Sequence, residues 1–357
     1  MHLACKSHTT VPSNNTSPRN ILLDILRGTV MLLVILQHTK FPFGGVILAF
    51  HMPMLFLLSG YTKEALQIRE NGFWSSLVKK AKRLLVPYLV FEAINLIGWI
   101  GICLVTQRDM NLASALLNIL LCRNTAAYTG LIGRLWFLPC IFLADVLCGV
   151  LRKYLSLPYK IIATVALFLA AWAIAEFVPV KLPFCLDSAI LGAAYIMLGG
   201  LGKKVVDVIL YHKNHLFPIL SIPVFGVAFV LCIGNGRSYL SMDAYAFFRF
   251  PLAILGSICG SLTFIAVIRY VGALLQLSRH ATQAISWFSL HSIAVYVVHI
   301  DINWCLGQVL EKLQAEHWLI SFVLVIVLSV PVIAFINFLC PWVVGEKRQT
   351  KRKNSIS

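Results

Sequence analysis

Residues 21–41 have the sequence ILLDILRGTVMLLVILQHTKF, an apolar run long enough to cross a bilayer as one helix. Similar runs recur along the 357-residue chain, in which 59% of the residues are hydrophobic and 12% are charged. The mean hydropathy is +0.84. These proportions exclude a soluble globular protein and a disordered chain. They predict an all-α fold, a polytopic membrane bundle of about ten transmembrane helices.

The apolar segments predict where the spans lie. We expect ten of them, near residues 21–41, 45–62, 84–106, 135–151, 159–178, 187–202, 216–234, 248–268, 285–304 and 318–340. The short apolar stretch 112–121 predicts an interfacial or re-entrant helix. Residues 21–340 are therefore expected to form one transmembrane domain. A polar cytoplasmic tail, 1–20, and a basic cytoplasmic tail, 341–357, are expected to flank it.

The net charge of +16 comes from 30 Lys and Arg residues against 14 Asp and Glu residues. In a soluble protein this excess would indicate nucleic acid, but in a membrane protein basic residues mark the cytoplasmic loops. With ten spans, 21 of the 30 basic residues fall on the side of the two termini. Both termini are therefore predicted to be cytoplasmic, with anionic membrane lipid, and not nucleic acid, as the partner of the basic loops.

The cysteines and the short motifs narrow the chemistry. Most of the ten cysteines lie singly inside apolar runs, without a CxxC or metal-type spacing, so we expect small buried residues and no metal site. The chain contains no Walker loop, GxGxxG, HExxH or GxSxG motif. This argues against nucleotide hydrolysis, metalloprotease and serine hydrolase activities.

The first span carries three polar residues that a bilayer should reject, Asp24, Arg27 and His38. Arg27 and His38 are eleven positions apart, which is about 20° beyond three full helical turns, so they share one helix face. Their separation along the axis is about 16 Å, roughly half the hydrocarbon thickness. The alternative is that Arg27 reaches the cytoplasmic interface, paired with Asp24, while His38 lies at the outer interface.

The second span brings another histidine to a similar depth. The turn signals before residue 45 predict a tight hairpin, which places His51 only slightly deeper than His38. Pro53, two residues later, is expected to leave a carbonyl near Ala49 without its helical partner. We expect the two imidazoles to meet, although a single intramembrane histidine is usually a structural hydrogen-bonding residue.

Later spans place four more side chains at the same outer level, namely Arg134, Trp136, His299 and Asp301. Trp136 is also typical of an interfacial aromatic belt. His291 lies nearer the membrane centre, and we expect it to be structural. Glu92 and Asp145 lie inside spans and are expected to face the bundle interior, where the sequence assigns them no partners.

A basic cluster precedes the third span on the predicted cytoplasmic side, and it consists of Lys79, Lys80, Lys82 and Arg83. Lys63 and Arg69 are expected in the same loop. Such a cluster is explained by topology anchoring together with lipid phosphate. It also suits a polyphosphorylated ligand, because Lys and Arg bind phosphate well.

Five blocks of these residues resemble the membrane acyltransferase 3 family in order and spacing. In that family an Arg and a His of the first helix are separated by ten residues, as Arg27 and His38 are. The blocks are Asp24, Arg27, Gly28 and His38; His51, Met52, Pro53, Phe56, Ser59 and Gly60; Arg83, Val86, Pro87 and Tyr88; Leu135, Trp136, Phe137 and Leu138; and Tyr296 with His299. The second block is similar to the fucose 4-O-acetylase-like branch.

The resemblance implies transfer of an acyl group, usually acetyl from cytoplasmic acetyl-CoA, to a hydroxyl of a sugar or cell-envelope glycan. It implies no permanently bound cofactor, and it gives Arg27 and His38 the essential roles. We expect His38 to act as base or acyl carrier, with His51 or Arg134 orienting the acceptor. The supporting residues are expected to be Asp24, Trp136 and His299. Arg27 and the 63–83 segment are expected to hold acetyl-CoA, through Lys79, Lys80, Lys82 and Arg83.

Two other classes of protein compete with this interpretation. A transporter or exporter of a lipid-linked sugar would use the buried charges as a proton or substrate path. It predicts internal repeats, but the Arg27–His38 spacing and the HxMP motif each occur once. A receptor or scaffold leaves the shared face of Arg27 and His38 unexplained. The sequence does not determine the acceptor, the acyl chain or the oligomeric state.

Overall fold

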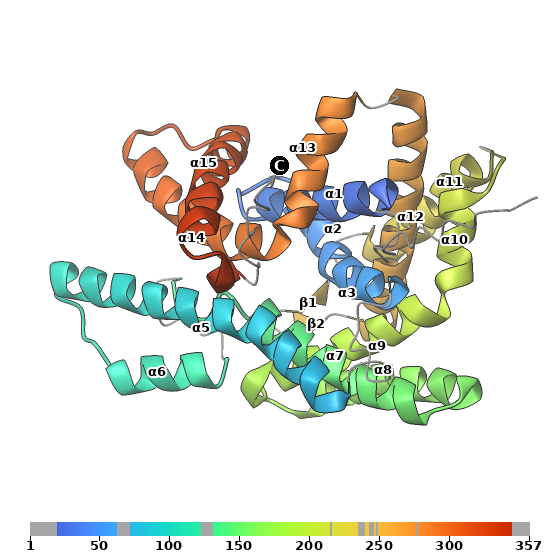
Figure 1. Cartoon of the computed structure of the whole chain (residues 1–357), viewed down its shortest axis with the longest axis horizontal. Helices are drawn as coiled ribbons and strands as arrows, with labels where there is room; N and C mark the ends of the chain where they lie inside the picture. Colours follow the sequence, from blue (N-terminus) through green and yellow to red (C-terminus); the bar gives the residue numbers. More distant parts are fainter. Residues whose placement is uncertain are drawn as a thin grey trace, which may run out of the picture.

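The computed structural model describes residues 20–62, 72–122, 131–214, 216–234, 240–242, 246–247, 249–275 and 278–344. Its described residues are almost entirely helical, as Figure 1 shows. Seven helical segments among the described residues are long and apolar enough to cross a membrane, and one of them, Gly44–Tyr61, contains two consecutive helices. Ile219–Ile233, within a longer helix, is a shorter apolar segment. The predicted all-α polytopic membrane bundle is therefore confirmed, while the number of spans and the sidedness of the termini stay predictions.

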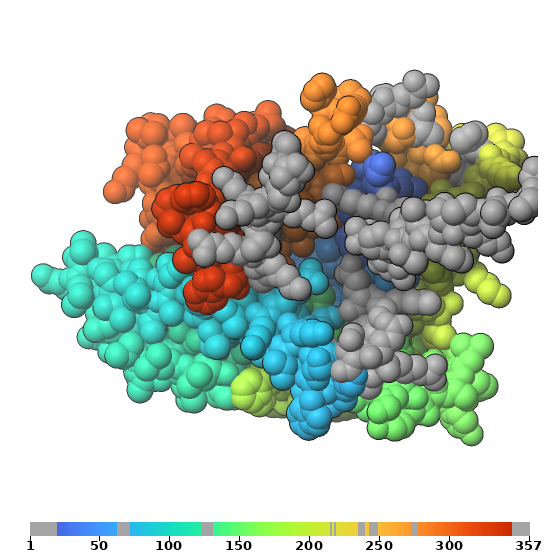
Figure 2. All heavy atoms as spheres, in the orientation of Figure 1, coloured from blue at the N-terminus to red at the C-terminus, as the bar shows by residue number. Residues whose placement is uncertain are grey.

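The first half of the chain forms a compact hairpin followed by long helices. In chain order they are α1 (Ile21–Gln37), α2 (Gly44–Leu48), α3 (His51–Tyr61), α5 (Phe73–Thr106), α6 (Leu112–Leu120), α7 (Phe137–Tyr154) and α8 (Leu157–Phe177). Figure 1 shows α6 beside the end of α5, at the edge of the molecule, where the expected short helix 112–121 lies. Figure 2 shows the atoms of these two helices forming that edge.

The second half begins with a short 3₁₀ turn and contains a single pair of two-residue strands among the described residues. Its elements are η1 (Pro183–Cys185), α9 (Leu186–Leu201), α10 (Lys203–Tyr211), α11 (Leu216–Ile233), β1 (Leu240–Ser241), β2 (Ala246–Phe247), α12 (Phe250–Leu275), α13 (Arg279–Leu290), α14 (Ser292–Lys312), α15 (Trp318–Leu339) and η3 (Pro341–Val344). The strands pair antiparallel, with Leu240 opposite Phe247.

The second expected span is two helices instead of one. The chain leaves helical geometry between α2 and α3, where Phe50 has a φ of −134°. Pro53 is the third residue of α3, within the first turn, where its missing N–H would have no partner inside the helix. The interruption therefore precedes the proline, and His51 opens the second helix.

The expected cytoplasmic loop 63–83 is helical from Phe73 onward, which corrects the predicted start of the third span at residue 84. With 34 residues, α5 is about 51 Å long, longer than the hydrocarbon layer of about 30 Å. Lys and Arg are good helix formers, so the helix continues through its basic turns beyond the apolar segment. The basic cluster therefore lies on a helix with defined faces.

The expected span 285–304 is divided at His291 into α13 and α14. The backbone N–H of His291 donates to the carbonyl of Trp287, and its ring Nδ1 lies 3.0 Å from the same oxygen. A side chain that competes for a backbone carbonyl in this way favours the end of a helix. His291 also stacks on the Trp287 ring, with 4.5 Å between centroids, in keeping with the structural role expected for it.

Glycines allow the central helices to touch through their backbones. A Cβ added at Gly60 of α3 would overlap the carbonyl oxygen of Ile196 of α9, and one at Gly199 of α9 would overlap that of Leu57. Small residues at crossing points are the usual way in which membrane helices approach closely. Gly28 of α1 makes the same close approach to the Ile285 carbonyl of α13. These contacts fix α1 and α3 within the bundle, and α1 and α3 carry Arg27, His38 and His51.

Candidate active site

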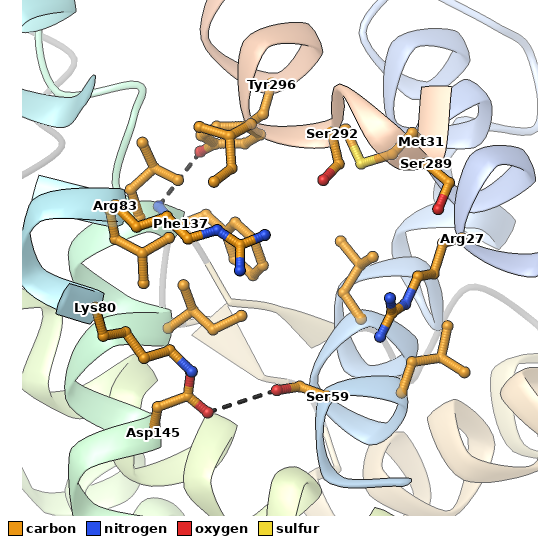
Figure 3. A pocket seen from close by; sticks show the side chains of 16 residues that line it. Arg27, Met31, Ser59, Lys80, Arg83, Phe137, Asp145, Ser289, Ser292 and Tyr296 are labelled. Carbon is orange, nitrogen blue, oxygen red and sulfur yellow. Dashed lines mark hydrogen bonds and ion pairs between the residues drawn. The ribbon is translucent and has the colours of Figure 1, made fainter. Parts of the chain in front are cut away.

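A cavity of about 170 Å³ lies between α1, α3, α5, α7, α13 and α14. Its polar lining consists of Arg27, Ser59, Lys80, Arg83, Asp145, Ser289, Ser292 and Tyr296, and the remaining side chains that line it are apolar (Figure 3). Three cations and one carboxylate thus face a largely apolar space. Figure 3 shows the Arg27 and Arg83 guanidinium groups directed into it from opposite sides. The lining suits a ligand that has anionic groups and an apolar arm.

The four cations of the basic cluster lie on different faces of α5, and only two of them line the cavity. Lys80, Arg83 and Leu84 line the cavity, because residues three and four positions apart share a face. Lys79 and Lys82 are exposed and do not line the cavity. Of the four cations predicted to bind a phosphorylated ligand, the structure therefore brings two to the cavity. Lys63 and Arg69 lie outside the described residues.

Asp145 has a partner that the sequence did not reveal. Its carboxylate forms an ion pair with the Lys80 ammonium, and the Ser59 hydroxyl lies 3.5 Å from its other oxygen. The Asp145 side chain is 1% exposed and that of Lys80 is 17% exposed. A buried carboxylate is tolerated when a cation and a hydroxyl surround it in this way. This group links α5, α3 and α7 at one end of the cavity.

Arg27 faces the cavity from α1, and its Nη2 donates to the Thr62 hydroxyl at 2.8 Å. Thr62 in turn donates to the carbonyl of Leu58, so the C-terminal end of α3 fixes the guanidinium. Asp24, one turn earlier, accepts a hydrogen bond of 3.3 Å from the Ser289 hydroxyl of α13. Asp24 thus connects α1 to α13 beside the cavity, whereas Arg27 lines the cavity itself.

His38 is the exposed C-cap of α1, and the residue beside it is His299 of α14. Their ring centroids are 5.4 Å apart, with 52° between the ring planes. The side-chain amide of Asn303, one turn after His299, donates to the His38 carbonyl at 2.8 Å. Two residues on one face of α14 therefore hold His38. The sequence placed His299 at the level of His38 but gave no sign of Asn303.

His51 is buried at the start of α3, with its Nδ1 2.8 Å from the carbonyl of Ile47 in α2. The break between the two helices leaves this carbonyl accessible to the ring. The hydrogen bond fixes the ring across the break. A contact between His51 and His38 stays a prediction.

Tyr296 connects the cavity to the histidine pair. It lines the cavity, and its ring centroid is 6.0 Å from that of His299. Its hydroxyl accepts the Phe137 N–H at 3.3 Å and donates to the Arg134 carbonyl at 3.2 Å. Tyr296 and His299 of α14 thus form a continuous series of neighbours from the cavity to His38 at the end of α1.

The turn before α7 is held by Glu92 of α5. The carboxylate is fully buried and accepts the backbone N–H groups of Gly133, at 3.1 Å, and Leu135, at 3.3 Å. Between these two residues lies Arg134, which is half-buried. Trp136, also half-buried, is the N-cap of α7 and makes an edge contact with the Phe137 ring. The predicted inward orientation of Glu92 now has a physical explanation in these two hydrogen bonds.

The fold and the cavity define a polytopic membrane protein with an internal site suited to an anionic ligand. The chain belongs to the membrane acyltransferase 3 family, because the family model for this acyltransferase domain matches residues 20–338. It is therefore an acyltransferase of the membrane type. The matched range includes every cavity residue and also His38, His51 and His299. No curated protein and no solved structure matched the chain. The fucose 4-O-acetylase-like branch stays a prediction.

Proposed function

We propose that this protein transfers an acetyl group from cytoplasmic acetyl-CoA to a hydroxyl of a sugar or cell-envelope glycan. One arrangement above all supports the proposal. Three cations line the cavity, and Tyr296 in its wall contacts His299, which in turn contacts His38. The family supplies acyl transfer as the reaction class. The cations favour a donor that carries phosphates, and a thioester of coenzyme A has this chemistry.

The donor is assigned to the cavity by charge and by polarity. Arg27, Lys80 and Arg83 supply positive charge for the phosphates of the coenzyme. Apolar side chains such as Met31 and Ile141 supply a surface for the thioester arm. Lys79 and Lys82, which do not line the cavity, have no part in this site and remain available to lipid phosphate.

The chemical step is assigned to His38. Its neutral imidazole takes the proton of the acceptor hydroxyl as the oxygen attacks the thioester carbonyl. A C–O bond forms, the C–S bond breaks, and the proton passes to the coenzyme thiolate. A covalent acyl group on His38 is the alternative route to the same product.

The positions of Arg27 and His38 on α1 define a path for the acyl group. The two residues are about 16 Å apart along the helix, with Arg27 at the cavity and His38 exposed at the far end. The excess of basic residues in alternate loops supports a cytoplasmic position for the Arg27 end. Donor and acceptor then approach from opposite faces of the membrane.

Acetyl transfer from radiolabelled acetyl-CoA to isolated envelope glycan, by protein reconstituted in lipid, tests the proposal. We expect transfer by the wild-type protein and none above background by the His38→Ala or Arg27→Ala variants, each still present in the membrane fraction. Mass spectrometry of the glycan should show the added acetyl mass. A fully active His38→Ala variant, or movement of the glycan without a change in its mass, would contradict the proposal.

A further inference from the structure

The ring of His299 is fully buried, and its hydrogen bonding fixes its tautomer. Nδ1 lies 2.8 Å from the carbonyl of Val295, one turn earlier in α14. A carbonyl only accepts, so in the neutral ring the proton is on Nδ1 and Nε2 carries a lone pair. This Nε2 has no hydrogen-bond partner among the residues that the structure describes. Because a buried acceptor without a hydrogen bond is destabilising, its retention calls for a partner in another state of the protein.

Two aromatic neighbours of His299 lie close enough to donate a hydrogen bond to its Nε2, namely Tyr296 and His38. The Tyr296 hydroxyl already donates its one proton to the Arg134 carbonyl. A neutral His38 ring carries one N–H. Two imidazoles joined by an N–H···N hydrogen bond have centroids about 5 Å apart, given the usual length of such bonds. The observed separation of 5.4 Å is only slightly longer.

The face of α14 that carries His299 also holds the backbone of His38. Asn303 lies one turn beyond His299 and donates to the His38 carbonyl at 2.8 Å. The His38 ring itself is exposed at the end of α1, so it can turn while its backbone stays fixed. Catalytic hydrogen bonds are often long in ligand-free proteins and shorten when the substrate binds.

We propose that His299 is a positioning residue for His38. In the substrate complex, Nε2 of His299 accepts a hydrogen bond from one ring N–H of His38. This bond turns the lone pair of the other His38 nitrogen toward the acceptor hydroxyl. A base that is oriented by a third group is a recurring arrangement in acyl transfer. The inference rests on the proposed function, because it assigns His299 a part in that reaction.

The reaction balances with His299 neutral throughout. The hydroxyl proton moves to the lone pair of His38 as the C–O bond to the acyl carbon forms and the C–S bond breaks. His38 is then an imidazolium that still donates to His299. It gives the proton from its other nitrogen to the coenzyme thiolate and returns to its neutral tautomer.

Paired amide substitutions separate this role from a structural one. In a His299→Gln variant the amide lies at the ε position and offers His38 an acceptor, whereas in His299→Asn it lies at the δ position and reaches only toward Val295. We expect His299→Gln to keep kcat within about tenfold of wild type and His299→Asn to lose about 100-fold, the usual scale of a base contribution. KM for acetyl-CoA should not change in either variant.

The opposite ranking, with the Asn variant the more active, would show that only the bond to Val295 matters. Equal kcat values for the two variants, high or low, also overturn the proposal. His291→Gln and His291→Asn form the matched control, because His291 makes the same type of bond to a carbonyl four residues earlier, and both should keep wild-type activity. An inactive wild-type protein would instead count against the proposed function.

A spectroscopic measurement gives an answer that does not depend on variant folding. With ¹⁵N-labelled histidine in the wild-type protein, the Nε2 resonance of His299 should move toward the hydrogen-bonded range when the acceptor glycan and a non-hydrolysable acetyl-CoA analogue are added together. An unchanged resonance in the saturated complex overturns the proposal.

Discussion

Lys80 and Asp145 form an ion pair at the wall of the cavity and join α5 to α7. The Asp145 side chain is almost completely buried, while the Lys80 side chain retains some exposure and lines the cavity. Asp145 thus neutralises part of the positive charge that Lys80 presents to an anionic ligand. The pair links the stability of the bundle to the charge of its proposed donor site.

The two halves of this ion pair should differ in their effect on stability. Lys80→Met leaves a buried carboxylate without its cation, a change that costs about 3–5 kcal/mol. Asp145→Asn leaves a cation that reaches the cavity, so the loss should be smaller. The double variant should denature at a higher temperature than Lys80→Met alone, measured by thermal unfolding in detergent. Additive losses in the double variant would contradict this coupling.

The two faces of α5 should differ in their effect on donor binding. Arg83→Ala should weaken acetyl-CoA binding by about tenfold, because a charge-assisted contact to phosphate is lost. Lys79→Ala and Lys82→Ala remove the same charge from side chains that do not line the cavity, and they should change the affinity less than about twofold. The acetyl-CoA concentration that gives half-maximal thermal stabilisation provides the measurement. Equal effects from all three variants would mean that net charge alone attracts the donor.

The two hydrogen bonds of Glu92 should be sensitive to its charge. In Glu92→Gln one carboxylate oxygen becomes an NH₂ group that faces a backbone N–H, so about 1–3 kcal/mol of stability should be lost. The turn that carries Arg134 should loosen, and acetyl transfer should fall. Glu176→Gln, at an exposed position of α8, serves as the control. Wild-type unfolding and activity in the Glu92 variant would exclude this positioning role.

The close approach of α1 and α13 should be intolerant of a methyl group. Gly28→Ala places a Cβ on the Ile285 carbonyl, and the displacement of one helix should cost about 1–3 kcal/mol or more. Because Arg27 is the adjacent residue, acetyl transfer should fall as well. Gly101→Ala is the matched control, since nothing lies within 4 Å of a Cβ there. That variant should be as stable as wild type or slightly more stable.

An exposed ion pair joins Lys40, in the turn after α1, to Glu316, between α14 and α15. Its dependence on salt tests whether these two segments lie together. Lys40 donates to Glu316 at 2.8 Å, and this hydrogen bond raises the pKa of the exposed Lys40 ammonium. A raised pKa means that any stabilisation is present below the ordinary value of 10.5 and is lost as the pH rises through the folded value. Between pH 6 and 8 the Lys40→Met variant should therefore show a constant difference from wild type, and that difference should shrink in high salt. A difference that varies across this window in thermal unfolding would contradict the assignment.

The sequence predicted the parts of the site that depend on one helix at a time. A shared face for Arg27 and His38 is predicted from the 3.6-residue period, and a common level for His299 and His38 is predicted from counting residues along a span. The sequence did not predict which cations of the basic cluster line the cavity, because the cluster was expected in a loop and it lies on α5, which begins at Phe73. Hydropathy could not place that start, because a helix with basic turns extends past the apolar segment into water.

The sequence by itself determined the class of protein, the approximate spans and the family. It could do so because a bilayer imposes a length and a composition on each helix separately, and because the motifs are local. Only the tertiary structure decided that Lys80 pairs with Asp145, that Glu92 holds the turn at Arg134, and that α14 holds His38 through residues more than 260 positions away. Those pairings depend on which helices pack together. Many small contacts and close glycine crossings set that packing, and no single segment of the sequence contains them.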